Sequence, residues 1–175
     1  MESKTQSLAE ILAVRDAGGE DVSALTALKS PEAIHRDRIR DAANSPGFRY
    51  LVLVKEGTAI GFACLVFVRP PTWSDAGDTA HLPQIVDLLV APEHRRRGYG
   101  SFFIRGMETI AKGSGNDSLY ISVDFPANPE AHALYLRLGY RQIQPEPYLK
   151  HWHFTDSGGE HHQGDEMVVD MVRSL

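Results

Sequence analysis

Arg95, Gly98 and Gly100 have the spacing in this 175-residue chain that is best suited to binding an anion. Two residues without a Cβ stand where a turn leads into a helix, so successive backbone N–H groups can converge on an anion without steric obstruction. Arg96 and Arg97 add positive charge, and the positive end of the helix dipole lies at the same place. The spacing therefore predicts a phosphate-binding turn.

The elements around this turn are predicted from apolar patterning. The apolar run from Ile85 to Val90 is typical of a strand covered on both faces, and Pro92 ends its hydrogen-bond ladder. Residues 99–112 carry an apolar stripe at helical spacing, and residues 119–123 form the next apolar run. Because a strand–helix–strand unit is a right-handed parallel crossover, we expect the two strands to lie side by side.

The turn allows two other interpretations. A glycine-rich turn with solvated arginines would carry the same residues. A dinucleotide-binding fingerprint would need a third glycine, and this chain has Phe103 at that position. The strand before the turn and the helix after it favour the phosphate-binding interpretation.

A second segment combines helix signals with a tyrosine. Asn128 suits an N-cap, Pro129 the first helical residue, and Gly139 the terminator. Tyr135 falls on the apolar face of this helix, where it is either a core aromatic or a functional group. Asn128 is likewise either a cap alone or a ligand contact.

Both segments are similar to signatures of the GNAT superfamily of acyl-CoA-dependent N-acyltransferases. The matching residues are Arg95-x-x-Gly98-x-Gly100 after a strand and Asn128-x-x-Ala131-x-x-Leu134-Tyr135-x-x-Leu138-Gly139-Tyr140. The resemblance covers residues 85–143, about a third of the chain. It implies an α+β, three-layer fold with a mixed, mostly antiparallel sheet of about seven strands, a central parallel pair and about four helices.

The resemblance also implies roles for individual residues. Tyr135 would be the general acid near the acyl-CoA sulfur, and Asn128 would bond the pantetheine arm. The two parallel strands would splay apart, which frees backbone groups near Val90 for the pantetheine amides. The residues expected to contact acetyl-CoA are Leu88, Leu89, Val90, Arg95, Arg96, Arg97, Gly98, Tyr99, Gly100, Ser101 and Asn128.

The general base is less well defined. Members of the family often place a Glu on the strand before the turn, but the positions of matching parity here are Gln84 and Val86. Asp87 is one residue out of phase, although a bulge could re-aim it. We therefore expect Asp87 as a catalytic candidate, with a buried structural aspartate or an ordered water chain as the alternatives.

The flanking segments complete the predicted fold. Before residue 85 we expect a strand at 10–15, a helix at 20–29, a helix at 31–43 capped by Ser30 with Pro31 as its first residue, a hairpin of strands at 48–55 and 59–69, and a loop at 70–78 containing Trp73. After residue 139 we expect strands at 140–144 and 166–173. The histidine-rich segment between them, residues 144–165, is expected to be a substrate lid or a dimer contact rather than a metal site.

Composition sets further limits. The length fits a single domain over residues 1–175, and the formal net charge of −5 argues against nucleic-acid binding. Cys64 is the single cysteine, so no disulfide framework is expected and a reducing compartment is favoured. No apolar run approaches the ~20 residues that span a bilayer. The chain start also lacks the apolar core of a signal peptide, so we expect a cytoplasmic protein with no membrane partner.

These observations lead to one functional expectation and two alternatives. We expect an N-acetyltransferase that uses acetyl-CoA as cosubstrate, without a metal, on a primary amine of a small molecule, peptide or protein. The alternatives are a non-catalytic acyl-CoA sensor on the same fold and an acyltransferase that uses a different acyl-CoA. If the protein is a homodimer, residues 144–165 are the segment expected to form the contact.

Overall fold

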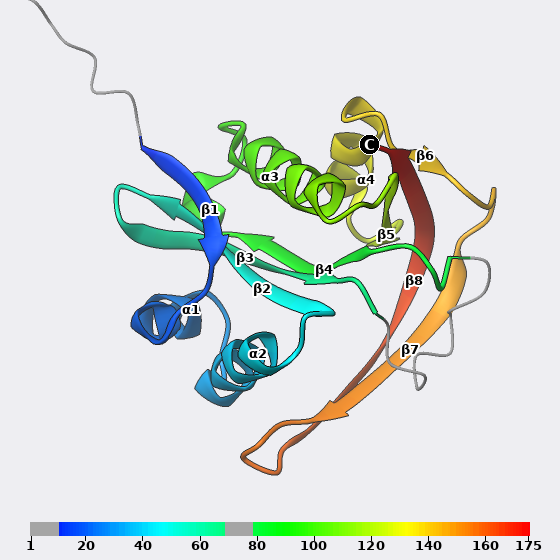
Figure 1. Ribbon diagram of the computed structural model, residues 1–175. Helices are drawn as coiled ribbons and strands as arrows, with labels where there is room; N and C mark the ends of the chain where they lie inside the picture. The colour runs from blue at the N-terminus through cyan, green and yellow to red at the C-terminus, as the bar shows by residue number, and fades with distance from the viewer. Residues whose placement is uncertain (1–10, 69–78) are drawn as a thin grey trace, which may run out of the picture.

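The computed structural model describes residues 11–68 and 79–175, and these residues form a mixed sheet with helices on both faces (Figure 1). The helices are α1 (Val22–Leu28), α2 (Glu32–Asn44), α3 (Tyr99–Gly113) and α4 (Pro129–Arg137), with 3-10 turns at Gly19–Asp21 and Pro92–His94. The strands are β1 (Leu12–Asp16), β2 (Phe48–Lys55), β3 (Thr58–Val66), β4 (Gln84–Val90), β5 (Ser118–Asp124), β6 (Arg141–Gln142), β7 (Tyr148–Thr155) and β8 (His161–Ser174). No helix in these residues is both long and apolar enough to cross a membrane.

The sheet confirms the predicted fold class. Within the described residues the strand order is β1-β2-β3-β4-β5-β8-β6, and β7 pairs with β8. β4 and β5 form the parallel pair, connected through α3 as the crossover rule requires, and the other pairs are antiparallel. The β2–β3 hairpin turns at Glu56 and Gly57, which both have positive φ, as a two-residue hairpin loop demands.

The sheet separates two apolar cores. On one face, α3 and α4 pack Phe103, Met107 and Tyr135 against alternate residues of β5 and β8. On the other face, Leu25 of α1 packs with Tyr50 and neighbouring side chains of β2 and β3 (Figure 1). Because side chains alternate along a strand, β2, β3 and β4 contribute to both cores. This arrangement places α3 and α4 opposite α1 and α2 across the sheet.

Several predicted boundaries were wrong: β3 ends at Val66, before the predicted end at 69, and of the predicted strand at 140–144 only Arg141–Gln142 is a strand, β6. α2 begins at Glu32, with Pro31 as its N-cap rather than its first residue, because Pro31 has an extended backbone with ψ 165°. The predicted strand at 166–173 is longer, since β8 begins at His161. The predicted loop at 70–78 with Trp73, and Arg69 at the end of the predicted hairpin, lie outside the described residues.

Strand β7 was missed by the sequence analysis. Its residues pair in register with β8, from Tyr148 opposite Val168 to Thr155 opposite His161, and form a projecting two-stranded arm. Most side chains of β7 are exposed, so neither face of the strand shows the apolar alternation that marks a half-buried strand. Its aromatic residues and the Ser-Gly-Gly turn that follows are the signals that could have identified it.

Candidate active site

The parallel pair opens immediately after it forms. In the described residues β4 pairs with β5 only at Gln84 and Ile85, which lie opposite Tyr120 and Ile121. β4 continues to Val90, and among the described strands it pairs there only with β3, where Gly61 lies opposite Val90. The remainder of β4 therefore presents a backbone edge that another extended chain can pair with.

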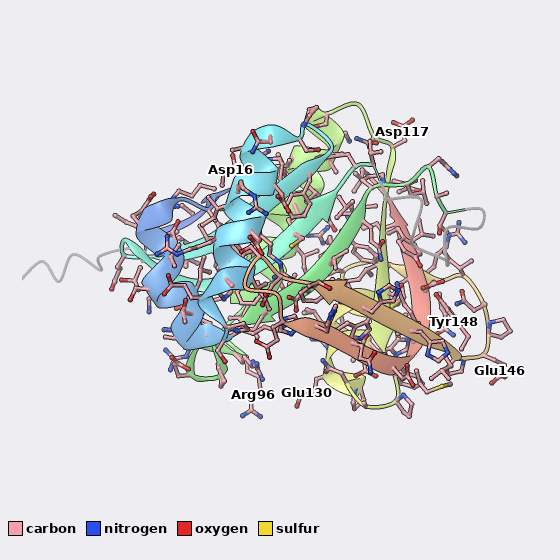
Figure 2. All side chains as sticks on the ribbon, turned by 90° about the horizontal axis from the view of Figure 1, so that it is seen from below. Asp16, Arg96, Asp117, Glu130, Glu146 and Tyr148 are labelled. Carbon is pink, nitrogen blue, oxygen red and sulfur yellow. The ribbon has the colours of Figure 1, made fainter. Side chains whose placement is uncertain are left out.

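One carbonyl on β4 is already occupied. The Nε of Arg95 donates a hydrogen bond to the Val90 carbonyl oxygen over 2.9 Å. Arg95 therefore folds the turn back onto the strand that precedes it. The exposed side chain of Arg96 instead projects from the turn at the edge of the molecule (Figure 2).

The turn ends in a glycine that caps α3. Gly98 has φ 83°, a left-handed conformation that L residues with a Cβ adopt at a cost, and Arg96 also has positive φ. Phe102 donates the first helical hydrogen bond, to the Gly98 carbonyl over 3.0 Å. The N–H groups of the residues between them precede this bond, so they remain at a helix terminus suited to an anion.

Tyr99 is placed differently from the other turn residues. Its side chain is buried in the core between β4 and α3, and the Nζ of Lys55 lies 5.5 Å from the ring centroid. Only its backbone N–H is positioned to serve a ligand at the helix start. Ser101 and Gly100 follow it in the first turn of α3.

Asn128 and Tyr135 lie at the start and middle of α4. The Asn128 Oδ1 accepts a hydrogen bond from the Ala131 N–H over 3.1 Å, as a capping residue does. Tyr135 is 3% exposed and stacks edge-to-face on Tyr140, with ring centroids 5.2 Å apart. Burial raises the pKa of the Tyr135 hydroxyl, so Tyr135 keeps its proton at neutral pH.

Asp87 lies in a β-bulge. The register between β3 and β4 shifts between Phe62 and Cys64, and Asp87 itself has φ 51°. The bulge directs its carboxylate toward α1 and α2, where it accepts from Lys29 Nζ at 2.8 Å and pairs with Arg38 Nη2 at 2.8 Å. Burial alone would raise the pKa of Asp87, but the charges of Arg38 and Lys29 outweigh it and hold the pKa below its ordinary value.

This ion cluster should be visible in the stability of the protein. Asp87→Asn is expected to lower the free energy of unfolding by about 2 kcal/mol at neutral pH, because it leaves the half-buried Arg38 without its charged partner. Since the pKa of Asp87 is lowered in the folded state, its contribution is complete above the unfolded value of ~3.9 and is lost as the pH falls through the folded value. Urea unfolding of wild type and variant from neutral pH to about pH 3 measures this convergence.

The control is the same substitution in an exposed ion pair. Asp16 binds Arg49 at 2.6 Å, but their side chains are 59% and 33% exposed. Asp16→Asn should therefore change the free energy of unfolding by less than ~1 kcal/mol. Equal losses in the two variants would contradict the role assigned to the Asp87 cluster.

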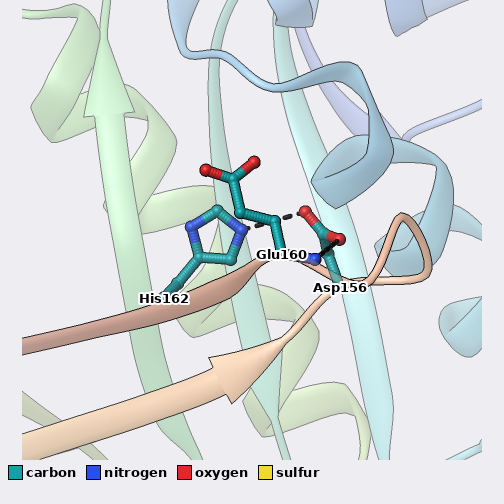
Figure 3. Close-up of side chains that lie close together, drawn as sticks. All are labelled: Asp156, Glu160 and His162. Carbon is teal, nitrogen blue, oxygen red and sulfur yellow. Dashed lines mark hydrogen bonds and ion pairs between the residues drawn. The ribbon is translucent and has the colours of Figure 1, made fainter.

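The β7–β8 arm reaches α2. At its tip the Ser157 N–H donates to the Asp37 Oδ2 of α2 over 2.8 Å. Asp156, nearly buried, accepts hydrogen bonds from the Glu160 N–H at 3.0 Å and from His162 Nε2 at 2.9 Å (Figure 3). These contacts fix the turn and join the arm to the α1–α2 side of the sheet.

The histidines of the arm do not converge. His151 bonds Asp165, His161 bonds Thr155, and His162 bonds Asp156. One group of side chains in the described residues could hold a metal ion: Asp156, Glu160 and His162, whose potential ligand atoms lie within 4.8 Å of one another. The hydrogen bonds of the turn already account for the geometry of this group.

Lys29 and Arg38 were missed by the sequence analysis. Lys29 is 58 residues from Asp87, and no local pattern relates the two. The spacing of Arg38 within α2 shows only that it lies on a helix. Their positions follow from the packing of α1 and α2 on the sheet.

A parallel pair that diverges beside a glycine-capped helix places a free strand edge next to a helix N-terminus, an arrangement suited to an extended, phosphate-bearing ligand. The chain belongs to the GNAT acetyltransferase family: the family model described as Acetyltransferase (GNAT) family matches residues 20–140. This confirms the resemblance inferred from the two sequence signatures.

Solved structures with the same fold cover almost the whole chain. A ribosomal-protein-alanine N-acetyltransferase from Brucella melitensis is 17% identical, with a TM-score of 0.66 over 93% of this chain and 99% of that chain. A phosphinothricin acetyltransferase from Sinorhizobium meliloti in complex with acetyl-CoA is 20% identical, with a TM-score of 0.65 over 94% and 88%. YncA, a putative acetyltransferase from Salmonella typhimurium with acetyl-CoA, is 17% identical, with a TM-score of 0.65 over 94% of each chain. No curated protein matches the sequence.

Proposed function

We propose that this protein is an N-acetyltransferase that transfers an acetyl group from acetyl-CoA to a primary amine by direct attack within a ternary complex. The observation that carries the proposal is the opening of β4 from β5 after Ile85 and Ile121, with the first turn of α3 beside it. Family membership and the acetyl-CoA complexes of two similar structures support the choice of cosubstrate.

The residues at this opening fit acetyl-CoA. The space where a Cβ of Gly98 would stand has no heavy atom within 4 Å, so a phosphate can approach the backbone there. The amides from Arg96 to Ser101, with the three arginines, would hold the pyrophosphate. Leu88, Leu89 and Val90 would offer backbone groups to the pantetheine arm, with Asn128 beyond its capping role as a further contact.

Tyr135 is proposed as the general acid. Its retained proton can pass to the CoA sulfur as the carbon–sulfur bond breaks. Burial raises the pKa of Tyr135 and so weakens it as an acid. A buried site also disfavours a free CoA thiolate, so the pKa of the CoA thiol would shift in the same direction as that of Tyr135. Backbone N–H groups on the open edge of β4, between Ile85 and Val90, would stabilise the oxyanion that develops on the carbonyl.

Asp87 is proposed to position Lys29 and Arg38 rather than to accept the proton of the acceptor. Its carboxylate is bound by both cations, and its low pKa makes it a weak base. The bulge nevertheless places the cluster beside the opening, on the face of the sheet that carries α1 and α2. The acceptor would approach from this face, because α3 and α4 lie on the face where the donor is held.

The proposal is tested by measuring thiol release from acetyl-CoA with alkylamines, amino acid amides and short peptides with free N-termini. We expect one class to give saturable turnover above the enzyme-free rate. Binding of acetyl-CoA without turnover on any acceptor would favour a non-catalytic acyl-CoA sensor. Faster turnover with a longer acyl thioester would favour a different acyl donor.

A further inference from the structure

Four polar side chains form a connected network on the α1–α2 face of the sheet, where no helix of the described residues covers β5 and β8. The Tyr120 hydroxyl lies 3.0 Å from Ser122 Oγ, and Ser122 Oγ donates to Asp170 Oδ1 over 2.7 Å. Tyr148 of β7 donates to both oxygens of the same carboxylate, at 3.1 and 2.9 Å. Tyr120 is fully buried and Asp170 is 9% exposed.

The hydrogen bonds in this network have a direction. Because Ser122 gives its only proton to Asp170, its oxygen accepts the proton of Tyr120. The hydrogen bonds therefore run from Tyr120 through Ser122 to the Asp170 carboxylate. Tyr148, which is partly exposed and lies on β7 (Figure 2), connects that carboxylate to the surface.

The network begins where the parallel pair opens. Tyr120 is paired with Gln84, and Ser122 is the first residue of β5 beyond the last paired position, Ile121. The side chains of Ile121 and its alternate neighbours belong to the α3–α4 core, so Tyr120 and Ser122 face the opposite side. This is the side from which the proposed acceptor approaches.

Gln84 supplies a second, independent observation at this place. It is 2% exposed, and its buried Oε1 has no hydrogen-bond partner among the described residues. Register places its side chain on the same face of the sheet as Tyr120, its partner across the parallel pair. A buried amide oxygen without a donor is costly, and an N–H group of a bound amine would satisfy it.

We propose that Gln84 binds the acceptor amine and that the Tyr120–Ser122–Asp170 chain removes its first proton; this inference rests on the proposed acetyl transfer. The ammonium gives one proton to the chain, and Asp170 gains one. The freed nitrogen lone pair forms the C–N bond at the thioester carbonyl, and the C–S bond breaks. The second nitrogen proton leaves with the thiol by way of Tyr135, so one proton in total returns to solvent through Asp170.

The titratable and charged groups around Asp170 are Tyr120 of β5 with Tyr148 and Lys150 of β7, and Lys150 Nζ lies 3.5 Å from Ser122 Oγ. Asp87 is less suited to the task, since two cations already occupy its carboxylate.

The test compares two acceptors in two variants at one position. The acceptors are the alkylamine with the highest wild-type turnover, which is protonated at pH 7, and hydroxylamine, which is neutral there and has no ammonium proton to lose. Ser122→Ala is expected to lower kcat/KM about tenfold for the alkylamine and less than twofold for hydroxylamine. The alkylamine deficit should shrink as the pH rises toward the amine pKa of ~10.4. Ser122→Thr retains a hydroxyl and should restore most of the activity.

Asp170→Asn gives a second reading with the same pair of acceptors, and acetyl-CoA affinity shows that each variant is folded. Equal losses with both acceptors, or no loss with either, would overturn the relay while wild-type turnover continues to support acetyl transfer. If the wild type binds acetyl-CoA but acetylates neither acceptor nor any amine of the panel, acetyl transfer itself fails and the relay fails with it.

Discussion

Replacing Tyr135 with phenylalanine is expected to lower kcat about 100-fold while the affinity for acetyl-CoA stays within about twofold of the wild type. General acids contribute on the order of 10²–10⁴ to rate, and Phe removes only the proton donor. The ring remains packed edge-to-face on Tyr140, so the core should be preserved. Steady-state thiol release with the best amine of the panel, together with calorimetric binding of acetyl-CoA, measures the two effects separately.

Tyr140→Phe is the matched control. It removes a hydroxyl from the adjacent ring in the same core, where that hydroxyl interacts with the Glu108 carboxylate. We expect kcat to change less than threefold in this variant. Equal effects in the two variants would show that Tyr135 acts through packing, and the general-acid assignment would be wrong.

Replacing Gly98 with alanine is expected to weaken acetyl-CoA binding about 30-fold. The new Cβ would stand beside the helix start, where no other heavy atom lies within 4 Å and where the phosphate is proposed to approach. Each hydrogen bond to a charged group contributes about 1.5–3 kcal/mol, so displacing the phosphate from one or two amides accounts for the loss. The dissociation constant can be measured by calorimetry at fixed salt.

Gly115→Ala separates this effect from backbone strain. Gly115 follows the end of α3, has the same φ of 83°, and likewise has no heavy atom within 4 Å of the place that a Cβ would occupy. Both alanine variants should lose about 1–2 kcal/mol of stability, because both place an L side chain in the left-handed region. Only Gly98→Ala should bind acetyl-CoA more weakly; comparable affinities in the two variants would contradict the phosphate site.

Local sequence patterns predicted the elements that lie within one segment. Asn128 caps α4, Pro129 begins it, and Gly139 follows its end with φ 92°, because capping depends on neighbours only a few residues away. The apolar run of β4, the glycine at the start of α3 and the crossover to β5 were identified for the same reason. The arm escaped prediction because its strands pair with each other while both faces remain largely exposed.

The sequence by itself determined the fold class, the family and the glycine turn, since these depend on residue types at short, fixed spacings. Only the tertiary structure decided which partners Asp87 has and that Ser122 meets Asp170. Lys29 lies 58 residues from Asp87, and Asp170 lies 48 residues from Ser122. Such contacts depend on strand register, on one bulge and on how helices pack across a sheet, and no local pattern encodes those three together.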